Sequence, residues 1–545
     1  MTKARRALIR ILLFACAVVA ASPVRAEPWT AEEIVAHARE AARVDRHQSS
    51  ITDFRSAIEL EPERRREWLP ELADQLTWSG KPGDAVPLYR EALERAPDPE
   101  AARRARLGLA LALSWNDQQA EALAELDALL AADPSDREAR LGRARVLSWM
   151  DRQGPAKSEY EQVLRDHPDD LQALRGVGRV QSWRGRQRDA SRRMQALLQD
   201  HPHDRESTAI LAESQRWMGR SDRAESLLRD QLAADPSDSR AASLLADVEA
   251  DQRPKVDLDW RESHQSNNLR ITSTRVESEF SFDDGRTLVG PALGLASFRP
   301  DSGPVDQILV SRPGLHAAHR FDDTFAWTGN FFVDVIDTQG ASGDHVVPTY
   351  DTWVTIWPDD VLRFDVGSSR STFDNEKSLR KGITASYAKV SMDVLPDELT
   401  RFSTRFNWGG YSDGNSRTWW QFEGERRVWN HPHVSTGYRY TGYDFAHLEP
   451  SSGYFNPNTY HANEALLSAS DTLGEKLRWY VGGSVGWEIT SPGRDRAIWS
   501  AGASLAYPIT ESLEIETAYD FFSSRTAASS GFERGTGRLS LRRLF

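Results

Sequence analysis

The stretch LRWYVGGSVGWEI, residues Leu477–Ile489, alternates two kinds of side chain along its length. Its odd-numbered positions carry Leu, Trp, Val and Ile, whereas its even-numbered positions carry Arg, Tyr, Ser and Glu, with glycines on both faces. A period of two residues is typical of a β-strand with one apolar and one polar face. Because aromatic residues stand near both ends of the apolar face, the stretch predicts a membrane-crossing strand whose apolar face meets lipid.

The same alternation recurs in sixteen segments between Lys255 and Phe545. Each segment with its connection takes about 18 residues, which fits strands of roughly 9–11 residues plus turns and loops. Short connections such as DDGR (283–286) and PDD (358–360) alternate with longer ones. Short periplasmic turns and long outer loops are typical of outer-membrane proteins, so residues 253–545 predict a sixteen-stranded antiparallel transmembrane β-barrel. The alternative, a soluble β-sandwich, would not need aromatic residues at both ends of its strands.

A different rhythm precedes the strands. One tryptophan recurs at spacings of 37, 34, 34 and 34 residues, and each copy keeps the same neighbours. A small residue lies five positions before it, an alanine seven positions after it and a proline nineteen positions after it. Small residues let two helices cross closely, and proline ends a helix. The copies are Trp78, Trp115, Trp149, Trp183 and Trp217.

This 34-residue unit of two helices resembles the tetratricopeptide repeat. A weaker unit without the tryptophan ends at Pro62, and residues 239–252 predict a capping helix. Residues 27–252 therefore predict an α-solenoid that folds as its own domain. We expect the tryptophans to pack between repeats, because a repeat cannot bury its own face alone. Stacking of a ligand on an aromatic row is the alternative.

The N-terminus has the pattern of a secretory signal peptide, residues 1–26. A basic stretch precedes the short apolar run ILLFACAVVAAS, and cleavage is predicted after Ala26. Cys16 is the only cysteine, so the mature chain would contain no disulfide and no thiolate metal site. No later stretch offers the ~20 apolar residues of a membrane helix. We therefore expect a cell outer membrane location for the barrel and a periplasmic location for the repeats.

Composition and motifs argue against several classes of protein. The net charge of −13 does not suit a nucleic-acid-binding protein. Gly482–Gly486 matches G-x-S-x-G by letters, but it lies within a predicted strand, whereas a nucleophile elbow joins a strand to a helix. The pairs His201/His203 and His431/His433 lack acidic partners at ligand spacing. We expect no enzymatic activity, no catalytic or metal site and no cofactor.

Two local motifs add a family resemblance. YSDGNSR (411–417) and GYFNP (453–457) both fall at expected outer loops. With an exported repeat domain before a sixteen-stranded barrel, the chain resembles the exopolysaccharide export porins, which include the poly-N-acetylglucosamine porin, the cellulose-export subunit and the YaiO-type barrels. The resemblance implies an outer-membrane pore, with repeats that gather polymer or partner enzymes in the periplasm. The repeat domain here is shorter than in the large exporters.

Two functions from different classes remain open. The first is a passive outer-membrane conduit for a secreted polysaccharide. The second is an interaction protein, in which the barrel anchors the repeats as a scaffold or displays loops as a surface receptor. Sixteen strands leave room for a channel, which favours transport. Expected partners are outer-membrane lipid, the barrel-insertion machinery, the polysaccharide and periplasmic polysaccharide-modifying or synthase-complex proteins.

Strand alternation also predicts which charged side chains face the lumen. Once the apolar faces are assigned to lipid, a set of carboxylates points inward, and unpaired carboxylate rings would select for cationic or neutral polymer. Inward arginines such as Arg275, Arg363 and Arg478 could instead balance them in a structural charge network. The predicted lumen-lining carboxylates are Glu277, Glu279, Asp365, Glu423, Glu425, Glu514, Glu516 and Asp520.

Overall fold

The computed structural model describes residues 29–545 apart from residues 301–306, 340–342, 449–451, 492–494 and 525–532. The predicted signal peptide, residues 1–26, lies outside the described residues. The chain divides into two compact units, Met1–Asp166 and His167–Phe545. Helices end at Asp251 and strands begin at Lys255, so the change of secondary structure falls inside the second unit. The domain boundaries after residues 26 and 252 stay predictions.

Helices follow one another from Ala31 to Asp251, and within each unit every helix packs against the next. Among the described residues, no helix has the length and apolar character to cross a membrane. The first unit holds α2 Ala31–Arg43, α3 His47–Leu60, α4 Arg65–Trp78, α5 Pro82–Glu94, α6 Pro99–Trp115, α7 Gln119–Ala132, α8 Arg137–Trp149 and α9 Gln153–Asp166. The second unit holds α10 Leu171–Trp183, α11 Gln187–Asp200, α12 Arg205–Trp217, α13 Ser221–Ala234 and α14 Ser239–Asp251.

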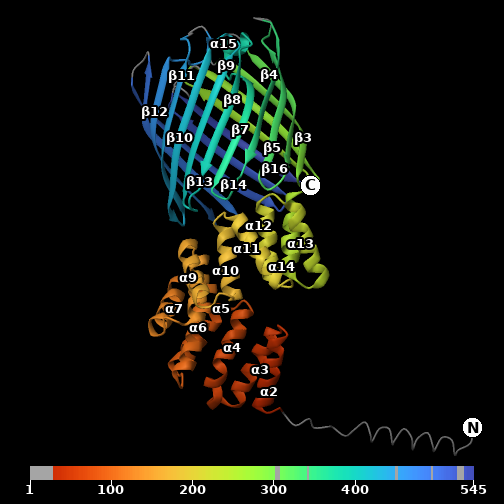
Figure 1. Cartoon of the computed structure of the whole chain (residues 1–545), viewed down its shortest axis with the longest axis vertical. Helices are drawn as coiled ribbons and strands as arrows, with labels where there is room; N and C mark the ends of the chain where they lie inside the picture. Colours follow the sequence, from red (N-terminus) through yellow and green to blue (C-terminus); the bar gives the residue numbers. More distant parts are fainter. Residues whose placement is uncertain (1–28, 301–306, 340–342, 449–451, 492–494, 525–532) are drawn as a thin grey trace, which may run out of the picture. The chain divides into compact units, whose positions relative to one another are not determined.

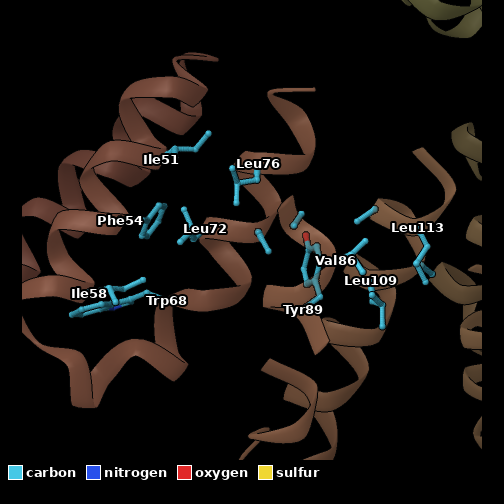
Figure 2. Packing of buried hydrophobic residues seen from close by; sticks show 14 of the residues in the cluster. Ile51, Phe54, Ile58, Trp68, Leu72, Leu76, Val86, Tyr89, Leu109 and Leu113 are labelled. Atoms are coloured by element: carbon cyan, nitrogen blue, oxygen red, sulfur yellow. The ribbon is translucent and has the colours of Figure 1, made fainter. Parts of the chain in front are cut away.

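The recurring residues have clear packing roles. The alanine seven positions after each tryptophan is fully buried, which lets the second helix of a pair approach the first. An aspartate that follows each proline caps the next first helix by accepting a backbone N–H, as Asp136 does from Ala139 at 3.0 Å. In the first unit, Figure 2 shows Phe54, Leu72, Tyr89 and Leu109 of successive helices in one continuous apolar core.

The five tryptophans do not belong to this core. Each is the last residue of its helix, and between 38 and 66% of each residue's surface is exposed. Trp78 and Trp115 meet edge to face with ring centroids 5.0 Å apart. The prediction that the tryptophans pack between repeats is therefore confirmed for Trp78 and Trp115, although all five tryptophans stay partly exposed and outside the buried core. Alanine and leucine side chains already fill the space between helices, so the larger rings end outside it.

The remaining chain closes into an antiparallel barrel in which β1 pairs with β16, as the sequence predicts (Figure 1). A short helix, α15 Glu376–Arg380, stands between β7 and β8. The strands are β1 Lys255–Gln265, β2 Leu269–Phe282, β3 Thr287–Pro300, β4 Ile308–Arg320, β5 Phe325–Asp337, β6 His345–Ile356, β7 Leu362–Thr372, β8 Thr384–Val394, β9 Thr400–Tyr411, β10 Ser416–Asn430, β11 His433–Phe445, β12 Thr459–Leu473, β13 Leu477–Ser491, β14 Arg496–Thr510, β15 Leu513–Phe522 and β16 Arg534–Leu544.

The outer face of the barrel is apolar. Register aligns Val481 of β13 with Ala503 of β14 and Tyr519 of β15, and the valine and tyrosine are exposed. We call the end where β1 begins and β16 ends the repeat-side end, and the opposite end the loop end. The motif YSDGNSR connects β9 to β10 and GYFNP lies between β11 and β12, so both stand at the loop end.

The turns inside the helix pairs generate a stability prediction. The residue two positions after each tryptophan has positive φ, 79° at Gly80 and 58° at Asp117. A left-handed conformation is strained for residues other than glycine, so Asp117→Gly should raise the free energy of unfolding of the helices by about 0.5–1 kcal/mol. Circular dichroism at 222 nm of the detergent-solubilised chain, followed through thermal unfolding, measures this change.

Gly80→Ala is the matched control, because a methyl group there meets no atom within 4 Å and only the backbone conformation is tested. It should lower the same free energy. A stability that falls in Asp117→Gly would contradict the explanation by backbone strain.

Candidate functional site

Ion pairs that skip a strand identify the inner face of the barrel. Lys389 Nζ on β8 donates to Asp351 on β6 at 2.8 Å, across β7. Arg478 on β13 donates to Glu514 on β15 at 2.6 Å, across β14. Adjacent strands lie roughly 4.8 Å apart, so side chains two strands apart meet where they converge on the concave side of a closed sheet. The lumen wall therefore carries these charged residues.

The register places all eight predicted carboxylates on this inner face. Most of them belong to ion pairs, including the three expected with Arg275, Arg363 and Arg478. Their role in lining a polymer path stays a prediction. The pairs are Glu277–Arg275 at 3.0 Å, Glu279–Lys255 at 2.6 Å, Asp365–Arg363 at 3.1 Å, Glu423–Arg439 at 2.7 Å, Glu514–Arg478 at 2.6 Å and Glu516–Arg538.

Glu425 and Asp520 differ from the other six. Neither has an ion-pair partner among the residues that the structure describes. Both lie close enough to Tyr480 on β13 to influence it electrostatically. Six of the eight predicted carboxylates are thus paired with a cation, and these two are the exceptions. Arg405 and Arg417 also line the inner face without an ion-pair partner among the described residues.

A cavity of about 810 Å³ opens on the inner face between β5 and β10. Its lining combines the charged residues Asp351, Asp365 and Lys389 with the aromatic ring of Trp353, over which the Lys389 ammonium lies at 4.2 Å. Asn407 of β9 also lines it. Such a mixture of charges, amides and an aromatic face suits a hydrated polar chain better than an apolar ligand.

The loop end of the lumen is covered by a packed cap. Leu379 of α15 is fully buried in a cluster with inner-face residues, among them Phe298 and Ile336. Ser378 donates to the carbonyl of Ser452 at 2.9 Å, which ties α15 to the loop between β11 and β12. Figure 1 shows α15 at this end of the barrel.

Aromatic stacking holds the second half of the cap. The ring of Tyr454 stacks on Tyr411 at 5.0 Å and on Phe373 at 4.9 Å, and its hydroxyl donates to Asp413 at 2.8 Å. Tyr454 belongs to GYFNP, whereas Tyr411 and Asp413 belong to YSDGNSR. The two motifs that carried the family resemblance therefore meet in one cluster at the loop end.

At the repeat-side end, turns of the last helix pairs contact turns of the barrel within the second unit. Arg184 donates to Glu398 at 2.8 Å, and Arg223 donates to Asp323 at 3.0 Å. Arg220 donates to the same aspartate. Arg186 donates to the carbonyls of Leu395 and Pro396 at 2.8 and 2.7 Å. We call this set of contacts the junction.

One junction contact completes a helix. The first turn of α11 has no side-chain cap of its own, and its N–H groups need acceptors. Asp360, in the turn between β6 and β7, accepts from the backbone N–H of Arg188 at 3.0 Å and from that of Asp189 at 3.1 Å. A barrel carboxylate thus caps a repeat helix, where the helix dipole favours negative charge.

The junction shifts two carboxyl groups in opposite directions. At Asp360, burial raises the pKa above its usual value, despite the two backbone hydrogen bonds. At Asp323, burial also acts to raise the pKa, but the Arg220 hydrogen bond and the charges of Arg220 and Arg223 outweigh it and the pKa is lowered. A lowered pKa stabilises the folded chain above the unfolded value near ~3.9 and loses that stabilisation as pH falls below it.

Sequence reasoning missed both the junction and the cap. A signal for the junction exists, because the turn RGRQRD (184–189) is basic and the short strand connections FDDT, PDD and PDE are acidic. Only the folded chain shows that these turns meet. For the cap, the sequence marks the two loop motifs that contain Tyr411 and Tyr454, but it does not show that these motifs meet.

The motifs examined for chemistry have structural roles. Ser484 lies in the middle of β13, and its hydroxyl donates to Glu464 at 2.6 Å. A methyl group at Gly483 would meet the backbone carbonyl of Ser500 on β14, which explains a glycine there. Within the described part of the chain, no group of His, Cys, Asp and Glu is arranged to hold a metal ion.

The capping role of Asp360 generates a prediction. Asp360→Ala should speed hydrogen exchange at the amides of Arg188 and Asp189 by about tenfold to a hundredfold, since a hydrogen bond to a charged group contributes roughly 1.5–3 kcal/mol. Hydrogen–deuterium exchange with mass spectrometry on the full chain measures it. Asp359→Ala is the control, because Asp359 accepts from its own turn at Val361 and Leu362. Equal exchange rates in both variants would contradict the capping of α11 by Asp360.

Comparison with protein families gives matches in both parts of the chain. Residues 352–479 match the PgaA membrane beta barrel domain. Residues 71–165 and 184–248 match tetratricopeptide repeat families. A comparison with curated protein sequences finds no match.

Several solved structures are similar. A bacterial polysaccharide outer membrane secretin is 13% identical with a TM-score of 0.43, over 54% of this chain and 99% of that one. A tetratricopeptide repeat protein from Parabacteroides merdae is 18% identical with a TM-score of 0.31, over 40% and 92%. PilW, a type IV pilus biogenesis factor, is 17% identical with a TM-score of 0.32, over 39% and 98%.

Proposed function

Since the chain carries tetratricopeptide repeats followed by an outer-membrane β-barrel domain of the PgaA family, we propose that it is a conduit for a secreted polysaccharide. The proposed activity is passive transport without catalysis. The alternative is a barrel that only anchors the repeats as a scaffold or displays its loops as a receptor.

One observation carries the proposal: the barrel has an apolar outer face and a charged, polar inner face around a cavity. A barrel that serves only as an anchor has no need of an inner wall with Asp351, Asp365 and Lys389 around about 810 Å³ of space. Charged and amide side chains provide hydrogen-bond partners that a polysaccharide exchanges for water as it moves.

Orientation follows from the same proposal. The repeat-side end faces the periplasm and the loop end faces the outside, so polymer enters beside the junction and leaves past the cap. The cap would then have to open during transport, because buried side chains of α15 and the loop between β11 and β12 cover the exit. Periplasmic polysaccharide-modifying or synthase-complex proteins are the proposed partners of the repeats.

The inner charges bear on the type of polymer. Glu425 and Asp520 add negative charge to the inner wall without a paired cation among the described residues, which supports a cationic or neutral glycan over an acidic one. A partly deacetylated amino-sugar polymer would carry suitable positive charge. The six paired carboxylates are proposed to maintain the charge network of the wall rather than to select the polymer.

The conduit is tested by blocking the lumen. In Asn407→Cys, a bulky thiol reagent should reduce both ion current in planar bilayers and polysaccharide export by cells, because Asn407 lines the cavity. The sole native cysteine, Cys16, lies in the predicted signal peptide and would not interfere. Phe406→Cys is the matched control, since the neighbouring residue faces lipid and its modification should change neither readout.

Loss of current without loss of export would favour the anchored scaffold. Export that does not depend on the chain at all, as measured in a deletion strain, would reject both transport and scaffolding of the polymer.

Charge selectivity has its own test. The double variant Glu425→Gln/Asp520→Asn should shift the potassium-to-chloride permeability ratio toward unity, because it removes the two carboxylates without partners among the described residues. Reversal potentials in a salt gradient measure the ratio. Glu423→Gln/Arg439→Gln is the control, since it removes an ion pair with no change of net charge. An unchanged ratio in the first variant would leave a neutral glycan as the better assignment.

A further inference from the structure

The tryptophans that end the first helices of the repeats are exposed aromatic rings with no role in the buried core, and we call those of each unit its tryptophan row. Exposure of a large apolar ring is costly in water, and grouped exposed apolar surface marks a binding site. In the first unit the row comprises Trp78, Trp115 and Trp149, and in the second unit Trp183 and Trp217. Each stands at the same place, the last residue of the first helix of its pair.

Hydrogen-bonding side chains follow two tryptophans of the first unit in the chain. Beyond Trp78, Lys81 donates to Gln48 at 3.4 Å. Beyond Trp115, the Asn116 amide donates to Gln118 at 2.7 Å, and its oxygen lies 3.1 Å from where a Cβ of Gly83 would stand. Side chains with amide or ammonium groups thus come within three residues after Trp78 and Trp115. An aromatic face beside amides suits a ligand with both apolar C–H faces and hydroxyl groups.

In the second unit, the row borders the junction. Trp183 directly precedes Arg184, which donates to Glu398 of the barrel. Trp217 lies three residues before Arg220, which donates to Asp323. A Cβ at Gly219 would stand 2.9 Å from Nε of Arg320, the last residue of β4. The last two rings therefore stand next to the repeat-side end of the barrel.

We propose that the tryptophan row binds the polysaccharide chain, each ring stacking on the apolar C–H face of a pyranose unit. This assignment rests on the proposed function of the barrel. A repeating receptor suits a repeating ligand, because the same contact recurs in every helix pair. In the second unit the row ends beside turns that contact the barrel, which supports a polysaccharide that enters the barrel as the ligand. Weak stacking at several rings holds a polymer without preventing its movement.

Calorimetric titration of the full chain in detergent tests the row. The probes are hexamers of β-1,4-linked glucose, N-acetylglucosamine and glucosamine. The wild-type chain should bind at least one of them, and Trp115→Ala/Trp149→Ala should weaken that binding about tenfold, since an aromatic contact typically contributes a factor of a few. Trp115→Tyr/Trp149→Tyr should keep most of the affinity.

Trp29→Ala is the matched control, because Trp29 is an exposed tryptophan of the same unit outside the row. Circular dichroism of every variant confirms that the helices are retained, as expected for side chains outside the core. The proposal is overturned if the wild-type chain binds none of the three hexamers, or if Trp115→Ala/Trp149→Ala binds as tightly as Trp29→Ala.

The two proposals fail separately. If blocking the lumen leaves export unchanged while hexamer binding depends on the tryptophans, the conduit is rejected and the glycan site is supported. If export depends on the open lumen but hexamer binding is unaffected by the tryptophan substitutions, the conduit is supported and the glycan site is rejected.

Discussion

The pairing of β1 with β16 is the constraint on which the second unit depends. In a bilayer no water is available for backbone N–H and C=O groups. An open sheet edge would therefore leave the backbone groups of a whole edge strand without hydrogen-bond partners. Pairing from Lys255↔Leu544 to Gln265↔Arg534 removes that edge. Once the sheet is closed, alternate side chains must face either lipid or the lumen. The apolar outer face and the charged inner wall both follow from this closure.

Closure also explains why so many charged residues are tolerated in the wall. Alternation along β10 turns Glu423 inward, and Arg439, directly opposite on β11, pairs with it. Pairing lowers the cost of placing charge in a confined space. The wall can then remain polar, with Glu425 and Asp520 as the two predicted carboxylates that have no ion-pair partner among the described residues. The inner wall thus serves both assembly and the proposed transport.

The junction and the tryptophan row together connect the repeats to the proposed route. Asp360 supplies the acceptors that α11 lacks, so the end of that helix depends on a barrel turn. The exposed rings of Trp183 and Trp217 come directly before the turns that make these contacts. The second unit therefore contains both the last repeats and the barrel, which is why its compact boundary at His167 does not coincide with the change from helix to strand.

Periodicity in the sequence was sufficient to determine the two architectures. A spacing of 34 residues with buried alanines requires stacked helix pairs, and alternation through sixteen segments requires a barrel with an assigned inner face, because both patterns act locally along the chain. Only the tertiary structure decided which groups from distant segments meet. It brought Tyr454 onto Tyr411, Asp360 onto the start of α11, and an arginine or lysine onto six of the eight inner carboxylates. It also left the tryptophans exposed, because alanine and leucine side chains fill the space between helices, and a repeating sequence does not show which of its residues fill that space.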